Sequence, residues 1–283
     1  MIVSILKSNS IMVYLLLVIL GLIILRVYFE RYHFQDNRIN NLVINMDSFI
    51  GKEEYDENNS LVSYFDNATM AIMADGHGKN LVGRKSSEIA VRTFEEVFRN
   101  FDILDNINYF FKRSFNLANK EILKTIDDEL GGTSVACALI KSDLLHYALA
   151  GNVKIFLYRN KEIIPLSEGH TVDIYAKKSF YNGKLCREKA IEALKNKRLL
   201  NYLGEDGFKE IEIYDIPIKL KKNDIVILMT NGIYESIPLI KVEEILEGNF
   251  NNSCEKLEKE FEKNTSHKKE NGSIILMQYK TNN

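Results

Sequence analysis

The segment 70–79 contains the residues of this sequence whose types and spacing are best suited to chemistry. It runs Met-Ala-Ile-Met-Ala-Asp-Gly-His-Gly-Lys, so an apolar stretch ends at Asp75, and Gly76 and Gly78 flank His77. Glycine allows the backbone to turn tightly. We therefore expect Asp75 and His77 to lie together at the end of a strand, a place where binding and catalytic side chains are common.

Two other interpretations of this segment are a phosphate-binding P-loop and a plain tight turn. The pair Gly78-Lys79 matches the Gly-Lys of a P-loop, but that motif needs glycine in place of Met73 and serine or threonine in place of Asn80. The P-loop is therefore excluded. A plain turn stays open when the segment is considered alone.

The elements that would position these residues are a mixture of strands and helices. Three residues separate the apolar runs 134–140 and 144–150, too few for a crossover helix, so this pair is predicted to be antiparallel, and so is the strand after Gly151-Asn152. Strands are predicted at 61–65, 69–74, 133–140, 144–150, 153–158, 211–216, 225–230 and 273–279. Helices are predicted at 84–99, 107–127, 187–195, 240–246 and 254–263. This pattern predicts an α+β fold in which helices cover sheets.

The first thirty residues predict a membrane anchor. Residues 11–25 contain no charged side chain, and 27–29 continue the apolar run past Arg26, giving about 19 residues against the roughly 20 that cross a bilayer. A cleaved signal peptide, the alternative, has a shorter apolar core followed by small residues at its cleavage site. Bulky residues follow this run instead, so we expect an uncleaved transmembrane helix within residues 1–29.

The charges beside this run predict the orientation of the chain. Lys7 precedes it, whereas Arg26, Arg31 and Arg38 follow it, which favours a single-pass membrane protein with a cytoplasmic C-terminal body. Residues 30–45 are predicted to be a juxtamembrane linker. No linker rich in Pro, Gly or Ser divides residues 46–283, so they are predicted to form one domain.

The composition excludes several other classes of protein. The 37 Lys and Arg are balanced by 39 Asp and Glu and are spread along the chain, so we expect no nucleic-acid partner. The three cysteines include no closely spaced pair, which indicates neither a disulfide framework nor a cysteine zinc site.

Five blocks of residues follow one another in the order of a known family. The segment 74–78 matches the motif Asp-Gly-His/Met-Gly, and Thr-Asn-Gly-Ile at 230–233 resembles Thr-Asp-Gly-Leu. The blocks are 51–57, 74–78, 132–134 with 147–154, 163–171 with 201–204, and 228–235 with 270–275. In order and spacing, the chain from about Asp47 to Tyr279 resembles the metal-dependent serine/threonine protein phosphatases of the PPM (type 2C) family.

This resemblance implies a fold, a reaction and partners. The fold is a central antiparallel β-sandwich flanked by helices, in four layers α-β-β-α, here preceded by one N-terminal transmembrane helix. At one end of the sandwich, a pair of Mg²⁺ or Mn²⁺ ions would activate water for attack on phosphoserine or phosphothreonine. The implied partners are phosphorylated proteins and a serine/threonine kinase pathway.

The resemblance also implies roles for individual residues. Lys52 stands in the place of a phosphate-binding arginine, and His77 in the place of a general acid. Asp75 would bridge both metals. The full set of implied metal ligands is Asp75, the Gly76 carbonyl, Asp56, Glu57, Asn231, Glu270 and Asn152. His170 is expected to make a structural hydrogen bond instead of binding metal.

Several of these positions depart from the family pattern. Asn231 and Asn152 replace carboxylates with neutral amides, and hard cations depend on carboxylate charge. Glu270 is one methylene longer than the usual aspartate, Asp56 is one shorter than the usual glutamate, and Lys52 lacks the two-pronged grip of arginine on phosphate. Two hypotheses follow. The chain is a membrane-anchored protein phosphatase weakened by the loss of ligands, or it is an inactive pseudophosphatase that binds phosphoproteins or regulates them.

Overall fold

The computed structural model describes residues 19, 21, 38, 39, 41–52, 56–79, 81–100, 106–127, 129–265 and 269–280. The chain divides into two compact units, Met1–Ile39 and Asn40–Asn283, and strand β1 (Arg38–Ile39) belongs to the first. Apart from Ile19 and Gly21, the predicted transmembrane helix within 1–29 lies outside the described residues. None of the helices within the described part of the chain has the length and apolar character needed to span a bilayer.

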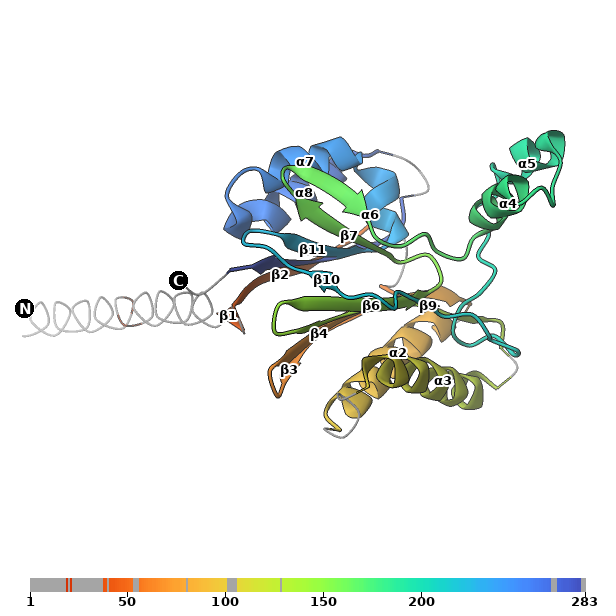
Figure 1. Ribbon diagram of the computed structural model, residues 1–283, viewed down its shortest axis with the longest axis horizontal. Coiled ribbons are helices and arrows are strands. Elements are labelled where there is room, and N and C mark those ends of the chain that lie inside the picture. The colour runs from red at the N-terminus through yellow and green to blue at the C-terminus, as the bar shows by residue number, and fades with distance from the viewer. Residues whose placement is uncertain are drawn as a thin grey trace, which may run out of the picture. The chain divides into compact units, whose positions relative to one another are not determined.

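The second unit is built on two antiparallel sheets (Figure 1). In the first, the strand order is β2-β12-β11-β7-β8. In the second, it is β10-β6-β5-β4-β3, with β9 also paired to β6. The strands of the first sheet are β2 (Leu42–Phe49), β7 (Lys154–Arg159), β8 (Glu162–Pro165), β11 (Ile225–Met229) and β12 (Gly272–Tyr279). Those of the second are β3 (Asn58–Phe65), β4 (Ala68–Gly78), β5 (Gly131–Lys141), β6 (Leu144–Ala150), β9 (Glu212–Ile213) and β10 (Ile218–Lys219).

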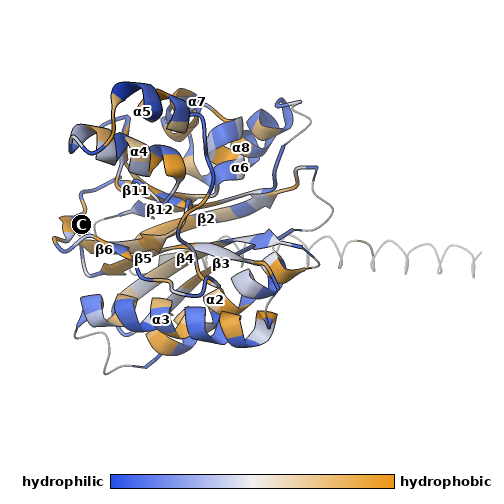
Figure 2. Ribbon diagram, turned by 90° about the vertical axis from the view of Figure 1, so that its right-hand side faces the viewer, coloured by the Kyte–Doolittle hydropathy of each residue, from blue (hydrophilic) through white to orange (hydrophobic). Residues whose placement is uncertain are grey.

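Helices cover the outer faces of both sheets, which gives four layers (Figure 2). Helices α2 (Val82–Phe98) and α3 (Ile107–Ile126) pack on the second sheet. Helices α6 (Asn231–Ser236), α7 (Leu239–Leu246) and α8 (Ser253–Glu262) pack on the first, with a short 3₁₀ helix, η2 (Phe250–Asn252), before α8. Two further helices, α4 (Val172–Tyr181) and α5 (Arg187–Ala193), form a hairpin that projects from the sheets (Figure 1). The predicted α+β architecture of antiparallel sheets flanked by helices is confirmed.

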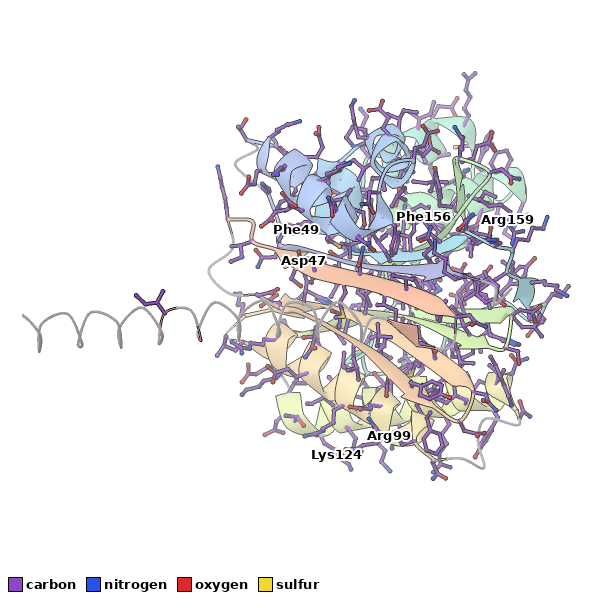
Figure 3. All side chains as sticks on the ribbon, turned by 90° about the vertical axis from the view of Figure 1, so that its left-hand side faces the viewer. Asp47, Phe49, Arg99, Lys124, Phe156 and Arg159 are labelled. Carbon is purple, nitrogen blue, oxygen red and sulfur yellow. The ribbon has the colours of Figure 1, made fainter. Side chains whose placement is uncertain are left out.

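Burial on both faces explains the composition of the central strands. The seven residues from Ala68 to Ala74 on β4 are all buried, because one face meets the other sheet and the other meets α2 and α3. The rings of Phe94 and Phe115 meet edge to face in the core beneath α2 and α3, with their centroids 4.9 Å apart. On the opposite side of the sandwich, Phe49 and Phe156 belong to the core between the first sheet and its helices (Figure 3).

Two sequence-based predictions are wrong in detail. Strands β6 and β7 were expected to be neighbours in one sheet, but they lie in different sheets. The reason is the turn at Gly151, whose φ of 109° is left-handed and which carries the chain across the sandwich. The predicted end of the linker, residue 45, is also too late in the chain, since β2 begins at Leu42. Leu42 and Ile44, alternate residues of this strand, are both buried in the core.

Candidate functional site

A cavity of about 410 Å³ opens at one end of the sandwich and receives residues from both sheets. The second sheet contributes the starts of β3 and β5 and the end of β4, and the first contributes the residues next to β11 and β12. The lining residues are Glu57, Asn58, Asp75, Gly76, His77, Gly78, Ser134, Asn152, Leu199, Asn231, Glu270 and Asn271. Seven of the nine sequence-predicted site residues are therefore brought together here.

Asp75 and Gly76 lie near the end of β4, as the sequence predicts. Asp75 faces Asn58 on β3 and Ser134 on β5 across the sheet. The Gly76 amide donates a hydrogen bond to the Glu57 carbonyl at 3.1 Å. A side chain at Gly76 would place Cβ 2.2 Å from the Gly83 carbonyl oxygen, so glycine is required for the first turn of α2 to approach β4 this closely.

The structure distinguishes the two acidic residues before β3. Glu57 lines the cavity, and its carboxylate packs against the first turn of α2 at Gly83. Asp56 is exposed and is not among the lining residues; its Oδ1 accepts a hydrogen bond from the Asn58 amide at 3.0 Å. Lys52 is also exposed and outside the lining, with its amide bonded to the Lys269 carbonyl at 2.9 Å.

Asn231 and Glu270 are joined directly on the side of the cavity formed by the first sheet. Nδ2 of Asn231, at the start of α6, donates a hydrogen bond to Oε2 of Glu270 at 2.6 Å. Oδ1 of Asn231 accepts one from the Gly232 amide at 2.8 Å. Both ends of the Asn231 amide are thus hydrogen-bonded to the protein.

Asn152, in the turn after β6, is hydrogen-bonded to residues of β5 and α6. Its Oδ1 accepts a hydrogen bond from Ser134 Oγ at 2.8 Å, and its carbonyl accepts one from the Tyr234 hydroxyl at 2.9 Å. The preceding Gly151 amide donates to Nδ1 of His170 at 3.0 Å. This last contact confirms the structural hydrogen bond predicted for His170.

His77 is partly buried at the cavity. Its ring meets the Tyr202 ring edge to face, with centroids 4.4 Å apart. Burial lowers the pKa of His77 to about 4, because removing water disfavours the charged imidazolium. His77 is therefore neutral at pH 7 and offers one N–H donor.

Sequence reasoning missed several lining residues, of which Asn58 is the most informative. Its Oδ1 is buried and has no hydrogen-bond partner among the described residues. Asn58 stands opposite Asp75 in the β3–β4 register. Extending the predicted strand 61–65 back to residue 58 would have placed this amide oxygen beside Asp75. Gly78, Ser134, Leu199 and Asn271 were also missed.

The oxygen donors of the cavity can be compared with the needs of a divalent metal ion. Glu57 and Asp75 supply carboxylates, Gly76 a carbonyl and Asn58 an amide oxygen, a set that suits hard cations such as Mg²⁺ and Mn²⁺. Asn231 uses its amide in hydrogen bonds instead. Within the described ranges, no group of three or more His, Cys, Asp or Glu side chains is arranged to hold a metal ion. The cavity lining thus offers oxygen donors of the kind that a hard cation takes, in Glu57, Asp75, Gly76 and Asn58, whereas at Asn231 the amide is hydrogen-bonded to the Glu270 carboxylate.

Comparison with known proteins identifies the relatives of this chain. No family model matches it. The chain is 25% identical over 198 residues to the serine/threonine phosphatase Stp of Listeria monocytogenes, an alignment that spans 68% of this chain and 77% of the relative. By sequence, this chain is similar to bacterial serine/threonine phosphatases. The resemblance predicted from the sequence blocks is confirmed.

Solved structures show the same fold. The serine/threonine phosphatase of S. agalactiae superposes with a TM-score of 0.73 at 18% identity, covering 85% of this chain and all of that one. The catalytic domain of the phosphatase PstP, solved in complex with two manganese ions, superposes with a TM-score of 0.64 at 15% identity, covering 85% of this chain and 99% of that one. The two antiparallel sheets and their helices are therefore the PPM phosphatase fold.

Proposed function

We propose that this chain is a membrane-anchored protein phosphatase that hydrolyses phosphoserine and phosphothreonine in proteins and has a weakened metal centre. The observation that supports this function is the convergence of Asp75, Gly76, Glu57 and His77 on one cavity at the end of the sandwich. The relatedness to serine/threonine phosphatases supports phosphoproteins as the substrates.

Within this function, the residues of the cavity have distinct tasks. Mg²⁺ or Mn²⁺, when bound, would neutralise phosphate charge and lower the pKa of an attacking water. Asp75, Glu57 and the Gly76 carbonyl would hold such an ion, since all three residues line the cavity and their oxygens are the donors that hard cations prefer. Without a cation these carboxylates would repel a phosphate dianion, so turnover is expected to require metal.

His77 would act on the leaving oxygen. As a neutral imidazole it can donate one N–H hydrogen bond to a phosphate ester. A bound phosphate dianion would raise the pKa of His77, because an opposite charge nearby favours the protonated ring. The substrate itself would thus bring His77 toward the state that a general acid needs.

The weakening of the centre is assigned to Asn231. Its amide oxygen and nitrogen are both engaged by the protein, and an amide contributes no negative charge to a hard cation. The same hydrogen bond favours a second candidate function. Because Asn231 and Glu270 satisfy each other without metal, the cavity could persist as a binding site in a pseudophosphatase that recognises phosphoproteins of a kinase pathway without hydrolysing them.

Phosphate release separates the two functions. The full-length chain in detergent micelles is mixed with a phosphothreonine peptide in the presence of Mn²⁺ or of EDTA, and released phosphate is measured. A phosphatase gives release that depends on Mn²⁺ and is lost in Asp75→Ala. Release no greater than that of Asp75→Ala would contradict the phosphatase and favour the pseudophosphatase, provided that the peptide still binds.

We propose that residues 1–29 anchor the chain in a membrane and that 46–283 lie in the cytoplasm. The uncharged run 11–25 and the excess of arginine on its C-terminal side support this arrangement. The anchor would confine the phosphatase to substrates near the inner face of the membrane.

A further inference from the structure

A second cavity, of about 470 Å³, lies beside α4. Three of its lining side chains are Lys154, Lys177 and Lys178, and a single carboxylate, Glu168, lines it with them. The exposed Tyr181 forms part of the same wall. We call this cavity the lysine pocket. Its excess of cations fits an anionic group on a side chain.

Among the lysines that line this pocket, Lys154 is the one whose positive charge a bound anion would stabilise most. Lys178 is paired with Glu168 at 2.8 Å, whereas the ammonium of Lys154 lies over the Tyr234 ring at 4.5 Å from its centroid. Burial lowers the pKa of Lys154 and the nearby Lys197 lowers it further, an effect that Asp173 and Glu235 offset only in part. Its charge is thus incompletely compensated, and a bound anion would stabilise it.

Tyr234 connects the lysine pocket to the candidate active site. One face of its ring receives Lys154, and its hydroxyl donates a hydrogen bond to the Asn152 carbonyl at 2.9 Å. Asn152 lines the first cavity. Tyr234 thus contacts one lining residue of each cavity, and those two residues, Asn152 and Lys154, are only two positions apart in the chain. Two residues of extended chain span about 7 Å, so an extended peptide bound in the first cavity can reach the lysine pocket.

The hairpin of α4 and α5 adds a positive field around the lysine pocket. Residues 172–198 contain eight Lys and Arg and three Asp and Glu, a net charge of +5 in a chain whose net charge is -2. The hairpin projects from the sheets (Figure 1), and Leu199 at its end lines the first cavity. An acidic peptide would be attracted to this side of the active site.

We propose that the lysine pocket is an anion subsite for an acidic residue of the phosphopeptide whose phosphorylated residue lies in the first cavity. The anionic group is a carboxylate of Asp or Glu or the phosphate of a second phosphorylated residue. This inference rests on the proposed function, because it assumes that a phosphopeptide occupies the first cavity. It makes the chain selective for phosphorylated residues in acidic or multiply phosphorylated sequences.

Peptide binding to the full-length chain in detergent micelles tests the subsite. Three fluorescent peptides carry the same non-hydrolysable phosphonate analogue of phosphoserine, flanked by glutamates, by a second such analogue, or by alanines. We expect the two anionic peptides to bind about fivefold more tightly than the alanine peptide, as for a partly buried charge pair. A preference for only one of them identifies the anion as carboxylate or as phosphate.

Lysine variants inside and outside the pocket test whether the preference for anionic peptides arises in the lysine pocket. Lys154→Gln and Lys177→Gln should each reduce the preference for anionic peptides, and Lys177 is an exposed side chain whose replacement leaves folding intact. Lys184→Gln, an equal charge change on the same hairpin but outside the lysine pocket, should retain it. Equal loss in all three variants, or equal affinity for all three peptides, would overturn the subsite and leave the proposed function standing. If none of the peptides binds, both proposals are wrong.

Discussion

Asn231 donates a hydrogen bond from Nδ2 to Oε2 of Glu270 over 2.6 Å, between the start of α6 and the residues that precede β12. Two carboxylates at this separation would need a proton or a cation between them. An amide facing a carboxylate needs neither. This side of the cavity is therefore held together by the protein itself.

Replacing Asn231 with aspartate should remove this hydrogen bond and leave two carboxylates that can bind a cation together. In EDTA, we expect Asn231→Asp to lower the melting temperature by about 2–4 °C, since a hydrogen bond worth roughly 1 kcal/mol becomes a repulsion between exposed charges. With Mn²⁺, affinity for the ion should rise about tenfold, because a second carboxylate joins Glu270. Thermal unfolding and calorimetric titration measure the two effects.

Asn160→Asp provides the control for this exchange. Asn160 is an exposed turn residue between β7 and β8, so the same change of charge should alter neither quantity. If Asn231→Asp behaved like Asn160→Asp, the assignment of Asn231 to the metal side of the cavity would be wrong.

Glu57 and Asp56 offer a second matched pair. Glu57 lines the cavity and Asp56 does not, so Glu57→Gln should weaken Mn²⁺ binding about tenfold or more, and Asp56→Asn should change it little. Each variant removes one negative charge at adjacent positions, which cancels long-range electrostatic effects. Calorimetric titration compares them, and a stronger loss in Asp56→Asn would contradict the placement of Glu57 in the site.

Long periodic segments account for the part of the fold that could be predicted. Strand β6 was predicted at its observed bounds, and α2 and α3 were predicted within two residues at each end. Short or weakly patterned elements were missed. Helix α4 buries only Asp173 and Ala176, so it has no apolar stripe, and α6 begins with Asn-Gly, which disfavours a helix.

The candidate site could be predicted only as far as local motifs extend. The motif around Asp75 placed Gly76 and His77 correctly at the cavity. The hydrogen bond between Asn231 and Glu270 joins residues 39 positions apart, and their separation depends on how α6 and β12 pack. Nothing local to either residue indicates that the amide would bind the carboxylate.

Gly76 should be essential for folding at the site. Its Cβ would lie 2.2 Å from the Gly83 carbonyl oxygen, which is backbone and cannot rotate away. We expect Gly76→Ala to cost about 3 kcal/mol or more of unfolding free energy in denaturant titration. Gly248→Ala should cost far less, because its Cβ would meet only the flexible end of Lys256 at 3.2 Å and the Ile245 carbonyl oxygen at 3.3 Å, contacts that a shift of a few tenths of an ångström relieves. Similar losses in both variants would mean that β4 and α2 are less closely packed than described.

Cys186 can report the side of the membrane on which the domain lies. Cys186 is exposed on the hairpin, whereas Cys137 is buried and Cys254 only partly accessible. If the body is cytoplasmic, a membrane-impermeant maleimide should label the chain only after cells are opened, and Cys186→Ser should remove most of that labelling. Strong labelling of intact cells would reverse the proposed orientation.

Acidification should destabilise the folded domain through His77. Its pKa is about 4 in the fold, against 6.5 as its ordinary value, so on acidification the unfolded chain binds the proton first. The resulting stability is present above pH 6.5 and is lost as the pH falls toward 4. Between pH 7 and pH 5 the loss from His77 is about 2 kcal/mol. Burial also lowers the pKa values of His146 and His170, which act in the same direction.

Denaturant titrations at pH 7 and pH 5 in EDTA, with and without His77→Gln, measure the contribution of His77. The variant should lose less stability than the native chain over this interval, by about 2 kcal/mol. Asp173 does not obscure the result, because its pKa is lowered from 3.8, and the stability it contributes is lost only below that value. An unchanged pH dependence in His77→Gln would show that His77 is already solvated and able to hold a proton near neutral pH, and its burial against Tyr202 would then be wrong.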